Sequence, residues 1–284
     1  MAVPIFMYIS GYVNTQSYIN KGVHSLSEMY SVKNLYNKTI RFVIPFTMMY
    51  SIQVCVKLFL LHQNLSLFSL VKMYLTGAEG AGSYYFPCMI QFIFIFPIIF
   101  RLIDKFKSKG LLVCFIVNIL YEILQRAYDM NHTCYRLLVF RYIFTISCGC
   151  YFRFNGLNIK RLHSILSVLF GIGYIYLITY TKYEPKIIIY WMGTSLFTAF
   201  YVVPFVNSFI KSGIEKCPRI ITLVGNATFN IFLTQATMYS YLSGTIYRLC
   251  ISRWSKLIIF IFIGVSVGVV FHLIERQITE KLKI

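Results

Sequence analysis

Long apolar runs separated by short polar segments are the main feature of the sequence. Eight of them come close to the roughly 20 residues that a helix needs to cross a bilayer: residues 42–61, 84–100, 111–124, 137–152, 163–181, 187–206, 220–242 and 257–274. A ninth run, residues 2–13, is apolar but short. The runs do not alternate between apolar and polar positions as the strands of a membrane barrel do. The pattern therefore predicts an all-α, polytopic membrane protein with about nine transmembrane helices in one bundle. We find no linker and no internal repeat, so we expect a single membrane-embedded domain over residues 1–284.

The composition supports the same class of protein. Hydrophobic residues make up 58% of the chain and charged residues 13%, whereas a soluble domain is roughly 45–50% apolar and about 25% charged. Too few polar residues remain to cover a surface in water, which excludes an ordinary soluble globule and a disordered chain. The net charge of +18 would suggest a polyanion partner, but the basic residues lie between the apolar runs. We therefore expect membrane lipids as a partner and no nucleic acid.

The basic residues are distributed unevenly among the segments between the runs. Taken in chain order, these segments form two alternating sets. The set that begins with residues 14–41 contains about twice as many Lys and Arg residues as the other set. Cytoplasmic loops carry such an excess, so we predict a multi-pass protein of the cell (plasma or inner) membrane with residues 14–41 and the C-terminus in the cytoplasm. Met1 would then lie outside without the basic segment of a signal peptide. We therefore expect one more helix upstream of Met1.

Five segments share a pattern of small, basic and aromatic residues with one known family. In chain order they are 2–12 (AVPIFMYISGY), 38–45 (KTIRFVIP), 82–86 (GSYYF) continuing to Gln91 and Pro97, 225–235 (GNATFNIFLTQ) and 272–278 (HLIERQI). In this order and spacing they resemble the acyltransferase-3 family of integral membrane O-acyltransferases. The family has ten spans, and its first span, which carries the His taken to be catalytic, is absent here. Gln235 stands where the family often has His, and Gln277 where it usually has Pro.

The resemblance implies an enzyme of acyl transfer. It would move an acyl group, with acetyl from acetyl-CoA expected, onto a hydroxyl of a cell-surface carbohydrate or a lipid-linked glycan. Acyl-CoA would be a substrate, and we expect neither a bound cofactor nor a metal. One alternative is a transporter or flippase for glycans or lipids, although the inverted repeats of many transporters are not evident. Another is an inactive remnant of an acyltransferase.

Lys38 and Arg41 are the candidate donor-binding residues. They are three residues apart at the predicted cytoplasmic start of a helix, so they share one face. Cationic side chains bind phosphates, such as those of acyl-CoA, through charge-assisted hydrogen bonds. The alternative is that they are anchors beside anionic lipid headgroups.

Glu275 and His272 are the candidate catalytic residues of this chain. They too are three residues apart, near the cytoplasmic end of the last span, and a carboxylate can orient an imidazole for proton transfer. The alternative is a packed His272 beside a Glu275 that faces water or pairs with Arg276.

The remaining candidates lie toward the predicted outer face. Glu122 and Arg141 are expected at similar depth on neighbouring antiparallel helices, where an ion pair of structural role would offset the cost of burying either charge. Tyr84 and Tyr85 could stack on a sugar acceptor, or they could belong to the aromatic belt common at membrane interfaces. Lys57, near the same face, is expected to snorkel toward the membrane surface.

Overall fold

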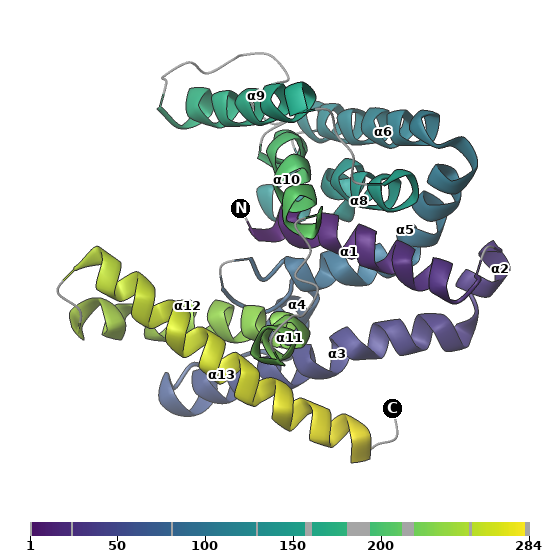
Figure 1. Ribbon diagram of the computed structural model, residues 1–284. Coiled ribbons are helices and arrows are strands. Elements are labelled where there is room, and N and C mark those ends of the chain that lie inside the picture. The colour runs from purple at the N-terminus through teal and green to yellow at the C-terminus, as the bar shows by residue number, and fades with distance from the viewer. Residues whose placement is uncertain are drawn as a thin grey trace. The chain divides into compact units, whose positions relative to one another are not determined.

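The structure, a computed structural model, is all-helical wherever it describes regular elements. It describes residues 2–23, 25–80, 82–128, 130–156, 161–180, 194–211, 219–249 and 252–281, and every regular element in these ranges is a helix (Figure 1). Within the same ranges, four helices are long and apolar enough to cross a membrane: Val32–Leu60, Tyr85–Phe106, Ser108–Gln125 and Ile258–Lys281. The all-α prediction is confirmed, and the number of about nine spans stays a prediction.

The chain forms two compact units, each built from two separate stretches of sequence. The first unit comprises Met1–Leu35 and Gln91–Gly213, and the second comprises Tyr36–Ile90 and Ile214–Ile284. The single domain over residues 1–284 stays a prediction.

The first unit is a set of helices around α1 and α8. Helix α1 packs against α8 and α10, and α9 packs against α10 (Figure 1). The elements of this unit are α1 (Ala2–Asn20), α2 (Leu26–Met29), most of α5 (Tyr85–Phe106), α6 (Ser108–Ala127), α7 (His132–Leu137), the 3₁₀ turn η2 (Val139–Tyr142), α8 (Ile143–Asn155), α9 (Arg161–Tyr180) and α10 (Thr194–Lys211). The first part of the predicted span 187–206 lies outside the described residues.

Helix α1 is longer than the apolar run that predicted it. The run ends at Val13, whereas the helix ends at Asn20. In the added turns, the side chains of Asn14 and Thr15 donate hydrogen bonds to the carbonyl oxygens of Ser10 (3.0 Å) and Gly11 (2.7 Å). The helix therefore satisfies polar groups that lower its hydropathy. At 1.5 Å per residue it is about 28 Å long, so the prediction of a short first element was wrong.

Two glycines allow the backbones of α1 and α8 to approach each other. A Cβ atom on Gly11 would lie 2.2 Å from the carbonyl oxygen of Ile146, and one on Gly149 would lie 2.2 Å from the carbonyl oxygen of Tyr8. Small residues have this role at helix contacts in membranes. Gly11, which lies in one of the family-like segments, is thus a packing residue.

We expect Gly149→Leu to reduce the amount of folded protein severely. The new side chain would collide with the backbone of α1, and such overpacking typically costs about 1–3 kcal/mol or more. Gly173→Leu is a suitable control, because no atom among the described residues lies within 4 Å of its Cβ position. Size-exclusion chromatography of a fluorescent fusion in detergent measures the yield. Equal yields of the two variants would contradict the close contact.

The second unit holds the candidate donor-binding and catalytic residues. It contains α3 (Val32–Cys55) from Tyr36 onward, the π-helical turn η1 (Val56–Leu60), α4 (Leu67–Leu75), the start of α5, α11 (Arg219–Asn226), α12 (Thr228–Leu249) and α13 (Arg253–Lys281). Its aromatic core includes Phe46, whose ring stacks on Phe86 with 3.5 Å between centroids. Helices α12 and α13 pack together, and a Cβ atom on Gly268 would lie 2.4 Å from the Cα of Ile231.

The segment predicted as one span over 220–242 forms two helices. Helix α11 ends at Asn226 and α12 begins at Thr228. The Thr228 hydroxyl donates to the carbonyl oxygen of Gly225 over 2.7 Å, which satisfies one carbonyl at the end of α11. The prediction of an uninterrupted helix was wrong here, because hydropathy does not report such a break.

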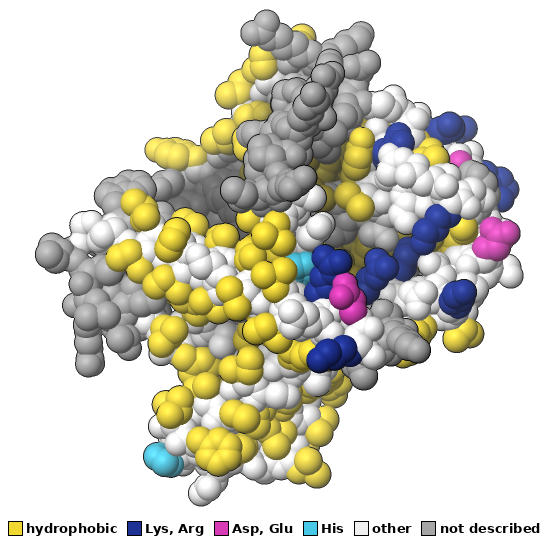
Figure 2. All heavy atoms as spheres, turned by 60° about the horizontal axis from the view of Figure 1, so that its bottom comes forward, with side chains coloured by type: hydrophobic (Ala, Val, Ile, Leu, Met, Phe, Trp, Pro, Cys, Tyr) yellow, Lys and Arg dark blue, Asp and Glu magenta, His cyan; other side chains and the backbone are white. Residues whose placement is uncertain are grey.

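Large apolar side chains remain exposed on the outside of α13. Ile258, Phe262 and Val270 are 65%, 71% and 56% exposed, and hydrophobic side chains occupy much of the surface in Figure 2. Soluble proteins rarely expose wide apolar surface. A lipid environment explains this exposure.

Candidate functional site

Helix α3 enters the second unit at Tyr36, and Lys38 and Arg41 lie just after this point. The Lys38 side chain is half-buried and the Arg41 side chain is exposed. Both are within one continuous helix, so their spacing of three residues places them on the same face, as the sequence predicted.

Helix contacts bring this basic pair to the same end of the second unit as His272 and Glu275. Phe42, which follows Arg41, packs edge-to-face on Phe229 of α12 with 5.0 Å between centroids. The next residue of α12, Asn230, is 4% exposed, and its Nδ2 lies 3.5 Å from Nδ1 of His272. Phe42, the neighbour of Arg41, and the imidazole of α13 therefore contact two adjacent residues of α12.

The imidazole of His272 and the carboxylate of Glu275 face each other, as their spacing predicted. His272 Nδ1 lies 3.5 Å from Glu275 Oε2, and the two side chains are only 18% and 13% exposed. The Thr279 hydroxyl lies 2.6 Å from the carbonyl oxygen of Glu275 and 2.9 Å from its Oε1, so its one proton can be donated to either oxygen. His272 Nδ1 thus has two neighbours at 3.5 Å, Asn230 Nδ2 and Glu275 Oε2; in the tautomer that carries its proton on Nδ1, Nε2 keeps the lone pair that a general base needs. Their catalytic role stays a prediction.

Glu122 and Arg141 of the first unit share a partner, Tyr135. The Tyr135 hydroxyl donates to both carboxylate oxygens of Glu122, over 3.0 and 2.8 Å. The guanidinium of Arg141 lies 4.6 Å from the centroid of the Tyr135 ring, which is cation–π geometry. Glu122 is 2% and Arg141 8% exposed. The direct ion pair stays a prediction. The sequence analysis missed Tyr135, because it lies in the connecting segment rather than in an apolar run.

Tyr85 does not present its ring to an acceptor. Its side chain is 6% exposed, and its ring packs against Phe232 and Phe229 with centroids 5.0 and 6.1 Å away. Of the two alternatives for Tyr85, a sugar contact and the aromatic belt, neither fits a ring that fills the interior of the unit. Tyr84 is half-exposed in the turn before α5, and its acceptor role stays a prediction.

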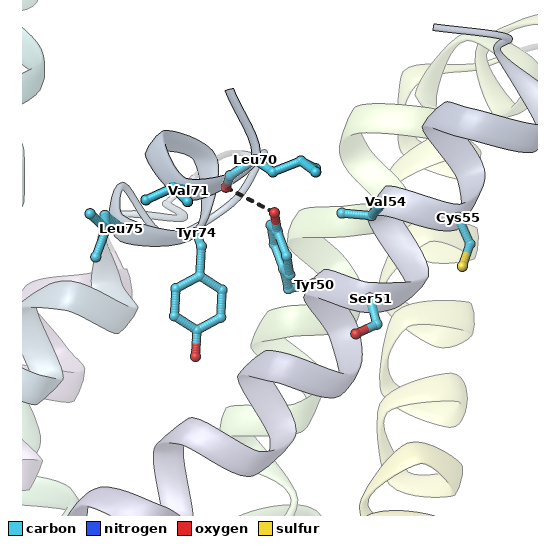
Figure 3. A pocket seen from close by; sticks show the side chains of 8 residues that line it. All are labelled: Tyr50, Ser51, Val54, Cys55, Leu70, Val71, Tyr74 and Leu75. Atoms are coloured by element: carbon cyan, nitrogen blue, oxygen red, sulfur yellow. Dashed lines mark hydrogen bonds between the residues drawn. The ribbon is translucent and has the colours of Figure 1, made fainter. Parts of the chain in front are cut away.

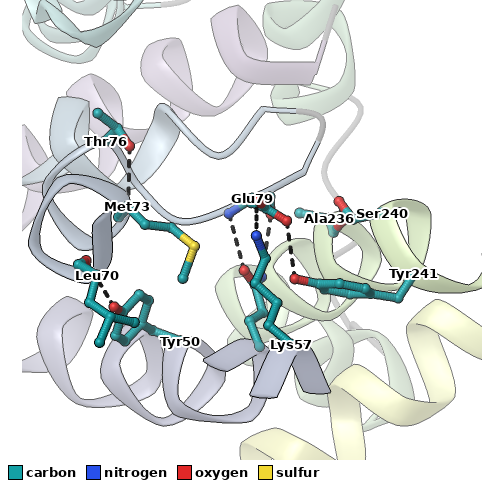
Figure 4. Close-up of polar contacts among 10 residues, drawn as sticks. Tyr50, Lys57, Leu70, Met73, Thr76, Glu79, Ala236, Ser240 and Tyr241 are labelled. Atoms are coloured by element: carbon teal, nitrogen blue, oxygen red, sulfur yellow. Dashed lines mark hydrogen bonds and ion pairs between the residues drawn. The ribbon is translucent and has the colours of Figure 1, made fainter. Parts of the chain in front are cut away.

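The structure also contains a polar cluster that the sequence analysis did not assemble. Lys57, in the π-helical turn η1, is 8% exposed and forms an ion pair with Glu79 (Figure 4). The Tyr241 hydroxyl of α12 donates to the other carboxylate oxygen of Glu79 over 3.1 Å. The Lys57 side chain thus turns into the unit, and the expectation that it snorkels was wrong. The signal in the sequence was Glu79 itself, an acidic residue within a glycine-rich loop that follows a span containing a lysine.

Gln53 of α3 fixes the backbone of Glu79. The Glu79 N–H donates to Gln53 Oε1 over 3.1 Å, and Gln53 Nε2 donates to the Glu79 carbonyl oxygen over 3.3 Å. Gln53 Nε2 also donates to the Thr237 hydroxyl over 2.7 Å. The preceding residue, Ala78, has a φ of 67°, a left-handed conformation that costs energy for a residue with a Cβ atom. The loop is therefore held firmly in one conformation.

A groove runs between α3 and α4 beside this cluster (Figure 3). Its volume is about 470 Å³, and its lining is mostly apolar: Tyr50, Ser51, Val54, Cys55, Leu70, Val71, Tyr74 and Leu75. The Tyr50 hydroxyl bridges the groove by donating to the carbonyl oxygen of Leu70 over 2.9 Å. A groove of this size and lining fits a hydrocarbon chain.

The described part of the chain contains no group of three or more His, Cys, Asp or Glu side chains that could hold a metal ion. The candidate sites described above consist instead of cations, carboxylates, one imidazole and tyrosine hydroxyls.

Comparison with known proteins identifies the family. The sequence model of the acyltransferase-3 family, described as an acyltransferase domain, matches residues 1–273. No curated protein and no solved structure gives a match. The family match includes Lys38, Arg41, His272 and the Lys57–Glu79–Tyr241 cluster, so it covers most of the groups described above. The chain therefore belongs to the acyltransferase-3 family of membrane acyltransferases.

Proposed function

We propose that the protein transfers an acetyl group from acetyl-CoA to a hydroxyl of a cell-surface carbohydrate or a lipid-linked glycan. Family membership supports acyl transfer in general. The observation that carries the finer proposal is the presence of two cations and a His–carboxylate pair at one end of the second unit. The charge bias of the loops supports a cytoplasmic location for this end, on the side where acetyl-CoA is available. The protein would act in the cell membrane, with its C-terminus in the cytoplasm.

In the proposed reaction the acceptor oxygen attacks the carbonyl carbon of the thioester. The new C–O bond forms, the C–S bond breaks, and CoA leaves as a thiolate that takes up a proton. Lys38 and Arg41 bind the donor phosphates. His272 accepts the hydroxyl proton at Nε2, and Glu275 stabilises the resulting imidazolium. By resemblance, the family assigns proton transfer to a His of its first span; among the residues of this sequence, we assign that role to His272.

Replacing Lys38 and Arg41 by Ala tests donor binding. We expect the KM for acetyl-CoA to rise about 100-fold or more, because two charge-assisted hydrogen bonds are lost and each contributes about 1.5–3 kcal/mol. The yield should change little, since basic side chains near the surface contribute little to stability. Initial rates of CoA release, measured with a thiol reagent on protein in lipid nanodiscs, give the KM.

Lys105→Ala is the control, because Lys105 is an exposed lysine in the last turn of α5. An unchanged KM in the Lys38–Arg41 double variant would identify these residues as lipid anchors. Absence of CoA release from the wild-type protein with any hydroxyl acceptor would refute acyl transfer from acetyl-CoA.

A further inference from the structure

We propose that Lys57, Glu79 and Tyr241 bind hydroxyl groups of the acceptor, and that the neighbouring α3–α4 groove holds a hydrocarbon chain of the same molecule. We call the three residues the hydroxyl site. The inference rests on the proposed function, and it identifies the acceptor as an amphipathic, lipid-linked sugar.

The hydroxyl site offers donors and acceptors on an accessible edge. One oxygen of Glu79 pairs with Lys57 and the other accepts from Tyr241. A carboxylate has about four lone-pair positions, so each oxygen can accept a further hydrogen bond. The Glu79 side chain is 41% exposed, whereas that of Lys57 is 10% exposed. The carboxylate therefore has a protected side, which holds its orientation, and an open side, which a sugar hydroxyl can reach.

A role in loop stability alone does not explain the charges. Gln53 already fixes the loop through both backbone groups of Glu79. Burying a lysine costs free energy, and apolar residues in place of a buried ion pair are often equally or more stabilising. The charged pair also lies at a π-helical turn, a feature found frequently at functional sites. These observations favour binding over simple loop attachment.

A small cavity beside Glu79 fits a single hydroxyl group. Its volume is about 10 Å³, and its polar lining comes from Gln53, Glu79 and Ser83. This is about the space that one water molecule needs. A hydroxyl oxygen of similar size would meet the same polar partners there.

The adjacent groove indicates the rest of the ligand. Tyr50 lines both the small cavity and the groove of about 470 Å³, so the polar and apolar spaces are neighbours. A free sugar would leave the groove unused, and an ordinary hydrocarbon would make no hydrogen bond to the open side of the Glu79 carboxylate. A sugar attached to a lipid chain satisfies both.

The hydroxyl site and the donor end are separated along α3. From Lys38 to Lys57 the helix advances about 28 Å at 1.5 Å per residue. Because the proposed base His272 lies at the donor end, an acceptor bound at the hydroxyl site must extend over this distance to bring a hydroxyl to it. A glycan of several sugars is long enough to do so.

Binding can be tested without turnover by amide hydrogen exchange. The probe is octyl β-D-glucoside, below its micelle concentration, added to the protein in phosphatidylcholine nanodiscs. Two matched probes separate the parts of the ligand: methyl β-D-glucoside has the sugar without the chain, and octyl tetraoxyethylene has the chain without the sugar. We expect octyl glucoside to slow exchange at residues 76–80, and each matched probe to do so at least about tenfold more weakly.

Two substitutions test the residues themselves. Glu79→Gln and Tyr241→Phe should each weaken octyl glucoside binding about tenfold, as expected for loss of a hydrogen bond that involves a charged group. Tyr241→Phe retains the Lys57–Glu79 ion pair, so it remains informative if Glu79→Gln does not fold. Glu280→Gln is the charge-matched control, because Glu280 is 62% exposed and pairs with Arg276.

Equal protection by octyl tetraoxyethylene, or unchanged binding in both variants, would overturn the hydroxyl site. Equal protection by methyl glucoside would overturn the role of the groove. The proposed function has a separate readout, which is release of CoA from acetyl-CoA with transfer of the acetyl group to a lipid-linked oligosaccharide. A protein in which octyl glucoside protects residues 76–80, but which transfers no acetyl group to such an acceptor, would support the site and refute the acetyltransferase proposal.

Discussion

Replacing His272 by Gln is expected to lower kcat for acetyl transfer about 100-fold or more, with little change in the KM for acetyl-CoA. A positioned general base typically contributes about 10²–10⁴-fold, and Gln cannot accept the hydroxyl proton. Glu275→Gln keeps a hydrogen-bonding group beside Nδ1 but removes the charge that stabilises the imidazolium, so we expect a smaller loss, about tenfold. Initial rates of CoA release at varied acetyl-CoA concentration separate kcat from KM.

The matched control for this pair is Glu280→Gln. Glu280 is on the same helix, and it pairs with Arg276 over 2.7 Å at the exposed surface, where an ion pair contributes little. It should leave both kinetic constants unchanged. If His272→Gln and Glu275→Gln raise only the KM for acetyl-CoA, the pair orients the donor. If neither constant changes, the pair is structural.

Local spacing explains which parts of the site could be predicted from the sequence. Lys38 with Arg41, and His272 with Glu275, are three residues apart on one helix, so the geometry of the helix alone puts each pair on one face. The structure adds what spacing cannot provide. Asn230 and Thr279, which contact His272 and Glu275, carry no distinctive sequence signal.

Contacts between distant segments explain what the sequence analysis missed. Glu79 meets Lys57 and Tyr241 through the path of a loop, and hydropathy does not encode such a path. Tyr85 occurs beside an expected membrane interface, yet its ring is buried because α12 supplies Phe229 and Phe232. The type of the elements was predictable because apolar length reports it. Their ends were less predictable: α1 continues past the apolar run to Asn20, and the side chains of Asn14 and Thr15 in the added turns form hydrogen bonds within the helix.

Separating Glu122 from Arg141 is expected to destabilise the first unit strongly. Glu122→Gln and Arg141→Gln should each lower the free energy of unfolding by about 3–5 kcal/mol, because removing one member of a buried pair leaves the other charge uncompensated. The double variant should recover part of this loss. The midpoint of thermal unfolding in detergent, followed by size-exclusion chromatography of heated samples, ranks the variants.

Tyr135 makes this test more specific. Tyr135→Phe removes the hydroxyl that donates to Glu122 but keeps the ring beneath Arg141. It should therefore cause a smaller loss than either charge removal, about 1–3 kcal/mol for an unsatisfied buried acceptor. Arg101→Gln is the control, since Arg101 is 46% exposed and pairs with Asp104 over 3.3 Å, so its loss should be at most about 1 kcal/mol. Strictly additive losses in the Glu122–Arg141 double variant would show that the two charges do not interact, and Tyr135 would then serve each of them separately.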